Sequence, residues 1–158
     1  MDNTFIFRRA EQKDLLDIIR LLSEDELGMN RELFDYNHIQ PCYQRAFDEI
    51  NSDSNQFLMV LEKDAKIVGT CHLTCMPSLT FQGSKRMNIE AVRVDQTLRN
   101  QKIGNYMLQQ SIQMARKNLC KIVQLTTNKK RLAAKKFYEK IGFEATHEGM
   151  KLYLQADE

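Results

Sequence analysis

The sequence IEAVRVDQTLRNQKIG, residues Ile89–Gly104, is the stretch that decides the fold. Its first part is rich in β-branched residues and predicts a strand that ends at Val94. A polar loop with Arg99 follows, and renewed apolar periodicity predicts a helix that starts near Lys102. The first N–H groups of a helix lack partners within the helix and carry the positive end of its dipole. We therefore expect an anion site here, most naturally for a pyrophosphate, with Gly104 allowing close approach of the backbone.

This stretch matches neither of two common phosphate-binding loops. The chain contains no GxxxxGK[ST] loop and no GxGxxG fingerprint. A strand, a polar loop and a helix with one glycine is a common arrangement, so an ordinary helix start remains the alternative at this point.

Strand and helix patterns continue on both sides of the stretch. We expect strands over Phe5–Arg9, Gln56–Glu62, Ile67–Met76, Arg86–Val94 and Lys121–Thr126, and one or two closing strands over Phe143–Leu154. We expect helices over Glu11–Glu26, Pro41–Ile50, Ile103–Lys117 and Arg131–Ile141. Short connections imply that the strands between Gln56 and Val94 pair antiparallel, and the strand–helix–strand order that follows implies a right-handed parallel crossover. The expected fold is a mixed α/β sheet with helices on both faces.

Length and composition indicate a single domain over residues 1–158. Hydrophobic residues make up 42% of the chain and charged residues 28%, which is typical of globular proteins. The longest apolar run, Phe57–Leu61, is far shorter than the roughly 18 residues that a membrane helix needs. The N-terminus has no signal-peptide core. We expect no membrane partner and a cytoplasmic protein.

The cysteines and histidines do not form a metal-binding pattern. Cys42, Cys71, Cys75 and Cys120 include no CxxC pair, and there are only three histidines, so we expect no structural metal site. Cys71 and Cys75 share one face of a predicted strand but lie too far apart to bridge. We expect reduced and mostly buried thiols.

Positive charge is concentrated in the second half of the chain. Arg99–Lys140 holds eleven Lys and Arg residues against the single acid Glu139, although the whole chain carries only +2. This asymmetry suggests a polyanionic ligand, and solvated helix faces are the alternative. Nucleic-acid binding is a weaker hypothesis, because the stretch has no helix-turn-helix signature and few aromatic residues. We therefore expect no nucleic-acid partner.

Two motifs resemble those of the GNAT superfamily of acetyl-CoA-dependent N-acetyltransferases. The stretch VRVDQTLRNQKIG resembles the family's [RQ]xxGx[GA] pattern, with Arg99 first, Gly104 last and Lys102 in place of the usual middle glycine. Downstream, AAKKFYEKIGF is similar to the family's AxxxYxxxGF signature. Its matching residues are Ala134, Tyr138, Gly142 and Phe143. The asparagine that often precedes this alanine by three is replaced by Arg131, with Asn128 nearby.

The resemblance implies a GNAT-like fold with a mixed, mainly antiparallel central sheet and helices on both faces. It also implies that acetyl-CoA is the co-substrate and that its pantetheine arm pairs with the strand before the loop. The residues implied to bind the coenzyme are Val92, Arg93, Val94, Arg99, Gln101, Lys102, Ile103, Gly104, Asn105, Tyr106, Asn128 and Arg131.

The resemblance also suggests catalytic residues. Tyr138 matches the tyrosine that protonates the leaving thiolate in related enzymes, and packing within the helix core is its alternative role. Glu90 is the leading candidate for the base that takes a proton from the amine, and it would share a strand face with Val92 and Val94. A purely structural carboxylate is its alternative. His72 and His147 are second choices for the base.

The implied activity is transfer of an acetyl group from acetyl-CoA to a primary amine by direct attack in a ternary complex. A non-catalytic acyl-CoA sensor or interaction module on the same fold is the alternative. In this family the acceptor pocket is built by the first two helices, their connection and late strands. Those parts correspond here to Glu24–Arg31 and His147–Met150, and the acids Glu24, Asp25 and Glu26 could attract a cationic amine. A small molecule or a peptide would fit as acceptor. Homodimers are frequent in the family, so the resemblance leaves a homodimer open as an alternative to a monomer.

Overall fold

The computed structural model describes residues 5–99 and 102–154, and it divides the chain into two compact units, Met1–Leu125 and Thr126–Glu158. The first unit contains strands β1 (Ile6–Arg9), β2 (Gln56–Lys63), β3 (Lys66–Met76), β4 (Lys85–Val94) and β5 (Cys120–Leu125). Its helices are α1 (Leu15–Ser23), α2 (Glu26–Met29), α3 (Pro41–Ser52), α4 (Thr80–Gly83) and α5 (Ile103–Lys117), with short 3-10 turns at Gln12–Asp14 and Gln96–Leu98. The second unit contains α6 (Leu132–Ile141).

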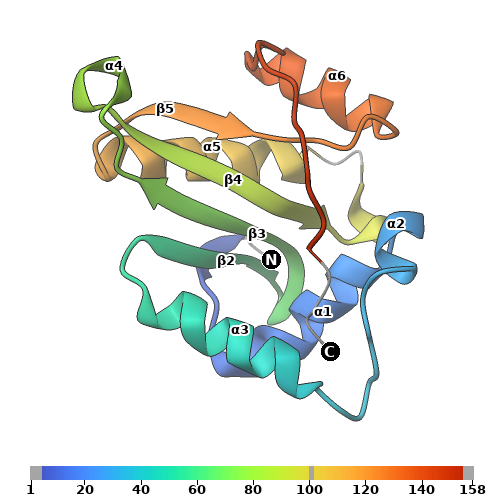
Figure 1. Cartoon of the computed structure of the whole chain (residues 1–158). Helices are drawn as coiled ribbons and strands as arrows, with labels where there is room; N and C mark the ends of the chain where they lie inside the picture. The colour runs from blue at the N-terminus through green and yellow to red at the C-terminus, as the bar shows by residue number, and fades with distance from the viewer. Residues whose placement is uncertain (1–4, 100–101, 155–158) are drawn as a thin grey trace. The chain divides into compact units, whose positions relative to one another are not determined.

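The five strands form one sheet in the order β1-β2-β3-β4-β5 (Figure 1). The first three pairings are antiparallel, and β4 pairs with β5 in parallel. The parallel pair is joined through α5, because parallel neighbours require a crossover connection. The expected mixed, mainly antiparallel sheet is therefore confirmed.

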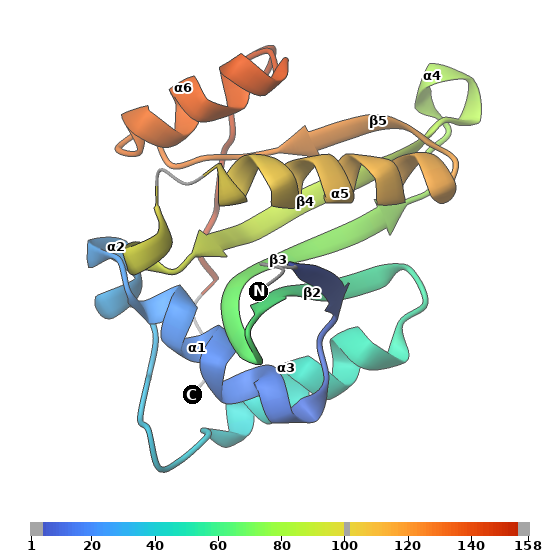
Figure 2. The same cartoon turned by 180° about the vertical axis from the view of Figure 1, so that it is seen from behind.

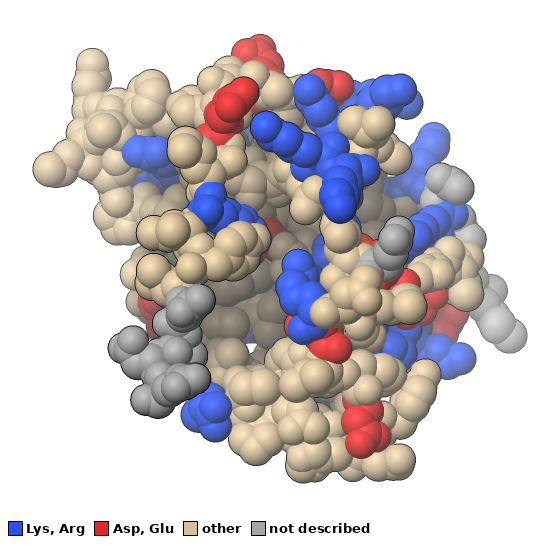
Figure 3. Space-filling model, turned by 45° about the vertical axis from the view of Figure 1, so that its right-hand side comes forward, with Lys and Arg blue, Asp and Glu red and all other residues tan. Residues whose placement is uncertain are grey.

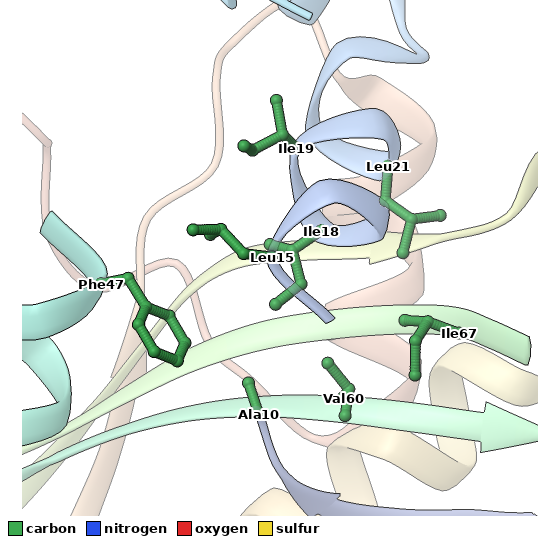
Figure 4. Packing of buried hydrophobic residues seen from close by; sticks show 8 residues of the cluster. All are labelled: Ala10, Leu15, Ile18, Ile19, Leu21, Phe47, Val60 and Ile67. Atoms are coloured by element: carbon green, nitrogen blue, oxygen red, sulfur yellow. The ribbon is translucent and has the colours of Figure 1, made fainter. Parts of the chain in front are cut away.

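Helices cover both faces of this sheet (Figures 1 and 2). On one face, Leu15 and Ile18 of α1 pack with Phe47 of α3 and Val60 of β2, all of them almost completely buried (Figure 4). These positions follow the helical spacing of the sequence, and Pro41 occupies the first turn of α3, where its missing N–H is harmless. The core on this face is the main source of hydrophobic stabilisation for α1 and α3.

On the other face, α5 lies close against β3. A Cβ added to Gly69 would come within 2.6 Å of the Met107 sulfur, so this glycine permits the close approach. The hydroxyl of Ser111 lies 3.7 Å from the Cys71 thiol, and burial raises the pKa of that thiol to about 12. Cys71 is therefore an inert packing residue at neutral pH.

Three elements differ from the prediction. The first helix is shorter than expected, since α1 ends at Ser23 and α2 starts at Glu26. The short helix α4, between two strands, has no counterpart among the predicted helices, and Phe81 and Gln82 within it are in the left-handed region. The closing strands expected over Phe143–Leu154 are wrong: residues 143–154 form no strand. A strand needs a backbone partner, and here Met150, Leu152 and Leu154 are largely exposed despite their alternating pattern.

A charged cluster fixes the start of α1 against the sheet. Both terminal nitrogens of Arg8 bind Asp14, at 2.6 and 3.0 Å, and the Arg8 Nε donates to Glu62 at 2.9 Å. The N–H of Glu11 also donates to Asp14. Burial of Asp14 by itself disfavours its charged form. The hydrogen bonds from Arg8 and Glu11 and the positive charge of Arg8 outweigh burial, so the pKa of Asp14 is lowered.

We expect the Asp14→Asn variant to lose about 2–3 kcal/mol of unfolding free energy at pH 7, because it leaves Arg8 short of a charged partner in a half-buried place. The pKa of Asp14 is lower in the folded state. Its contribution is therefore full above the unfolded-state value of about 3.9 and is lost as the pH falls through the folded-state value. Urea unfolding at several pH values measures this. Asp17→Asn is the control, since Asp17 is half exposed and lies 3.5 Å from Arg20. An equal loss in both variants would contradict the prediction.

Candidate active site

The site is built around the point where β4 separates from β5. The two strands pair from Lys85↔Cys120 to Ile89↔Leu125, and no pairing is recorded beyond that among the described residues. Residues 90–94 of β4 continue past this point, and their other edge is paired with β3. A strand with one unpaired edge can accept hydrogen bonds from, and donate them to, an extended ligand.

A bulge at Ala91 changes the direction of the β4 side chains. Ala91 has φ 52, a left-handed value that is unfavourable for a residue with a Cβ. The register shows the extra residue: His72 lies opposite Glu90, whereas Thr70 lies opposite Arg93. Residues opposite each other on antiparallel strands share a face. Glu90 and Arg93 therefore lie on one face, and the predicted common face of Glu90 with Val92 and Val94 is wrong.

Glu90 and His72 form a pair across β3 and β4. The Nδ1 atom of His72 lies 3.3 Å from Glu90 Oε1, and Asn88 donates to the other carboxylate oxygen at 3.2 Å. The His72 side chain is 13% exposed, whereas the Glu90 side chain is 56% exposed. Sequence reasoning named both residues as separate candidates and did not predict their contact.

The N-terminus of α5 has the features expected of an anion site. Lys102 precedes the helix with φ 61, and its side chain makes no capping hydrogen bond. A left-handed residue at this position accounts for the glycine in the family pattern. Ile103 is buried, while Arg99, Lys102, Asn105 and Tyr106 are exposed. Among the described residues, the side chain of Lys102 does not compete for the amides of the first turn, and Gln101 lies outside the described residues.

The acidic residues predicted to attract an amine have partners inside the protein. Glu24 pairs with Arg20, which also lies 3.3 Å from Asp95. Asp25 accepts a hydrogen bond from the N–H of Gly28 at the start of α2, and its carboxylate lies 3.6 Å from Arg93. These acids anchor the connection between α1 and α2 to the end of β4. The Arg93 side chain, only 11% exposed, thus faces Asp25. The side chain of Glu26 lies outside the described part of the structure.

The structure of the second unit gives a physical reason for the AxxxYxxxGF motif. Gly142 has φ 108 and its N–H donates to the carbonyl of Glu139, while the N–H of Phe143 donates to the carbonyl of Tyr138. This pair of bonds is a Schellman cap, which needs a left-handed residue and brings the residue after it against the last turn. The rings of Phe143 and Tyr138 meet edge to face, 5.9 Å apart. The GF sequence therefore ends α6 and fixes the tyrosine ring.

The two polar candidates before α6 have local roles. The side chain of Asn128 accepts a hydrogen bond from the N–H of Lys130, and its carbonyl accepts one from the N–H of Arg131. Arg131 directly precedes α6. Lys and Arg side chains gather on the face of the molecule that Figure 3 shows. On α6 itself, Lys135, Lys136 and Lys140 are exposed. His147 is exposed and bonds Thr146.

Cys75 and Cys120 also have structural surroundings. The thiols of Cys75 and Cys120 lie 3.8 Å apart, and burial together with Cys75 raises the pKa of Cys120 to about 11. Cys42 is exposed, unlike the other three.

Within residues 5–99 and 102–154, no three His, Cys, Asp or Glu side chains gather in a way that could hold a metal ion. No helix in that part of the chain combines the length and apolar character needed to cross a bilayer.

Comparison with known proteins shows which family this architecture represents. The family model described as Acetyltransferase (GNAT) family matches residues 17–143. The chain therefore belongs to the GNAT acetyltransferase family, whose members use acetyl-CoA.

Three individual relatives span almost the whole chain. A glucosamine 6-phosphate N-acetyltransferase of Trypanosoma brucei brucei is 28% identical over 148 residues, which are 89% of this chain and 99% of that protein. A crystal structure described as a transcriptional regulator from Bacillus halodurans C-125 is 39% identical, with a TM-score of 0.92 and coverage of 96% and 100% of the two chains. A predicted acetyltransferase from Clostridium acetobutylicum, solved with acetyl-CoA, shares the fold at 19% identity, a TM-score of 0.74 and coverage of 95% and 96%.

Proposed function

We propose that this protein transfers an acetyl group from acetyl-CoA to a primary amine by direct attack in a ternary complex. The observation that carries the proposal is the parting of β4 from β5 beside the uncapped start of α5. An extended pantetheine arm would pair with the unpaired edge of β4 over Val92–Val94, as an added strand. The pyrophosphate would lie at the amides of the first turn of α5, with Arg99 and Lys102 adding positive charge.

The reaction needs a base that takes a proton from the amine and an acid that protonates the thiolate. An alkylamine with a pKa of about 10.4 needs roughly 4.6 kcal/mol to lose its proton at pH 7, so a base near the amine assists the reaction. The neutral nitrogen attacks the thioester carbonyl carbon, and the carbon–sulfur electron pair leaves with the coenzyme A sulfur. The nitrogen then loses a second proton, which restores the acid that protonates the sulfur. We assign the first proton to the pair of Glu90 and His72, and we assign Tyr138 as the acid that protonates the departing thiolate.

The proposal is tested by measuring thiol release from acetyl-CoA with a panel of primary amines. The panel includes alkyl and aryl amines, lysine, short peptides with free N-termini, and amino sugars with glucosamine 6-phosphate among them, because one relative carries that name. We expect at least one amine to raise thiol release about 100-fold or more above the rate with acetyl-CoA alone. Saturable binding of acetyl-CoA in calorimetry with no amine-dependent release would contradict the proposal.

A non-catalytic acyl-CoA sensor is the second candidate. It is favoured by the 39% identical structure described as a transcriptional regulator and by Lys102 in place of glycine. This function predicts tight binding of acetyl-CoA, no turnover with any amine, and a change in affinity for a macromolecular partner when acetyl-CoA is bound. The amine panel and calorimetry together separate the two candidates.

A further inference from the structure

A small apolar cavity lies between α1, α3 and the sheet, beside the pair of Glu90 and His72. Its volume is about 150 Å³, and Ile18, Leu22, Phe47, Ile50 and Leu58 are among its lining residues. His72 and the bulge residue Ala91 line it from the sheet. The cavity therefore reaches the two strands at the position where Ala91 shifts the register.

Only two titratable side chains line this cavity among the described residues, His72 and Tyr43. The Tyr43 hydroxyl is already engaged, since it donates to Glu32 at 3.0 Å and accepts from the N–H of Leu33 at 2.8 Å. His72 faces Glu90 through Nδ1, and its Nε2 is buried with no hydrogen-bond partner among the described residues. Buried polar atoms in folded proteins are almost always bonded, so an unpartnered nitrogen on a residue that lines a cavity points to a missing ligand atom.

We propose that the cavity holds an apolar substituent of the acceptor amine and that His72 Nε2 takes the proton that this amine loses. The inference rests on the proposed acetyltransferase function. The N–H bond of the ammonium group breaks, and its proton goes to Nε2. The freed nitrogen lone pair then forms the new bond to the acetyl carbon, and the sulfur of coenzyme A leaves with its electron pair. The nitrogen loses its second proton as the sulfur gains one, so the products are the amide and the free thiol. The carboxylate of Glu90, at 3.3 Å from Nδ1, balances the imidazolium charge and makes Glu90 a positioning residue.

The chemistry of the two residues favours this division of roles. An imidazole titrates near neutral pH as a class, which suits proton transfer at pH 7 better than a carboxylate does. Glu90 is more than half exposed, whereas His72 is almost buried and borders the cavity. An exposed carboxylate can orient a ring without touching the substrate.

The lining of the cavity defines the class of acceptor. An apolar protein cavity of about 150 Å³ holds a molecule the size of benzene. Hydroxyl groups placed there would lose water without gaining hydrogen bonds. The acceptor is therefore a primary amine with one phenyl-sized or short alkyl substituent, in preference to a polyhydroxylated amino sugar.

The selectivity test uses phenethylamine and glucosamine as probes with the full chain and acetyl-CoA. We expect kcat/KM to be at least about tenfold higher for phenethylamine, in line with burial of one apolar group. Ala46 also lines the cavity from α3 and is exposed, so Ala46→Leu fills the space with little risk to folding. This variant should lower kcat/KM for phenethylamine at least tenfold, with the KM for acetyl-CoA unchanged. Glu49→Leu adds the same side chain at an exposed position of α3 and should have no effect.

The proton-transfer test uses His72→Gln, Glu90→Gln and Glu90→Asp. His72→Gln should lower kcat about 100-fold and remove the acidic limb of the pH profile of kcat. Glu90→Gln should lower kcat less, and Glu90→Asp should restore part of the loss while KM stays constant. Thermal unfolding and acetyl-CoA titration establish that each variant is folded.

The outcomes separate this inference from the proposed function. Turnover of any amine with a kcat unchanged in His72→Gln would overturn the role of His72. Equal activity on both probes, or no effect of Ala46→Leu, would overturn the cavity as acceptor site. If no amine is acetylated, the proposed function and the role of His72 both fail. Calorimetric binding of phenethylamine to the acetyl-CoA complex, weakened in Ala46→Leu, would then still support the cavity, and absence of binding would overturn it.

Discussion

Replacing Gly104 by valine is expected to raise the KM for acetyl-CoA about 100-fold while kcat changes little. Gly104 is the second residue of α5, directly after Lys102 and Ile103 at the uncapped helix start. A branched side chain there would stand in front of the amides that the pyrophosphate is proposed to approach. The expected change corresponds to about 2.7 kcal/mol of binding free energy. Titration of coenzyme A by calorimetry measures the same loss without requiring an acceptor.

Gln109→Val is the matched control for this variant. Gln109 is an exposed residue further along α5, so the substitution puts the same β-branched side chain into the same helix away from its N-terminus. On helix propensity alone, valine is a better helix former than the glycine at 104 and a poorer one than the glutamine at 109, so each unfolding free energy should change by less than about 1 kcal/mol. Equal coenzyme affinity in Gly104→Val and Gln109→Val would show that the start of α5 does not hold the pyrophosphate.

Replacing Tyr138 by phenylalanine is expected to lower kcat about 100- to 1,000-fold with nearly unchanged KM for acetyl-CoA. The variant removes only the hydroxyl, and the edge-to-face contact with Phe143 and the cap at Gly142 keep the ring in place. A positioned proton donor contributes a factor of about this size when the leaving group is a basic thiolate. Steady-state rates with a fixed amine and varied acetyl-CoA measure the effect.

Tyr153→Phe provides the control for loss of a phenolic hydroxyl in the same unit. Tyr153 is 83% exposed and should tolerate the change with wild-type rates. Should Tyr138→Phe retain the wild-type kcat, the hydroxyl would have no part in protonating the thiolate, and Tyr138 would be a packing residue of α6.

The regular elements follow from the sequence because their patterns are local. Helix α5 runs from Ile103 to Lys117 as its apolar spacing predicts, and α3 begins at Pro41 as expected. The parallel step from β4 to β5 also follows from the strand–helix–strand order. The two helices are defined by residues close together in sequence, and the parallel pair is defined by the order of consecutive elements.

The geometry of the site was harder to predict because it depends on one backbone conformation. Ala91 carries no signal for a left-handed φ, so uniform alternation along β4 placed Glu90 with the wrong neighbours. The contact between Glu90 and His72 depends on register between two strands, and a register is not visible in either strand alone. The prediction of closing strands was wrong for a related reason. The alternation in Met150–Leu154 is a side-chain pattern, whereas a strand also needs a backbone partner.

The strand β4 leaves its parallel neighbour after Ile89, so the sheet of the free protein is incomplete along one edge. If the acyl donor fills that gap, it serves as a temporary structural component as well as a reactant. The donor then binds backbone groups that are aligned for it only in the folded protein. The free energy of unfolding would therefore rise with the logarithm of donor concentration. The supply of acetyl-CoA would thereby set the stability of the folded chain as well as the rate of the reaction.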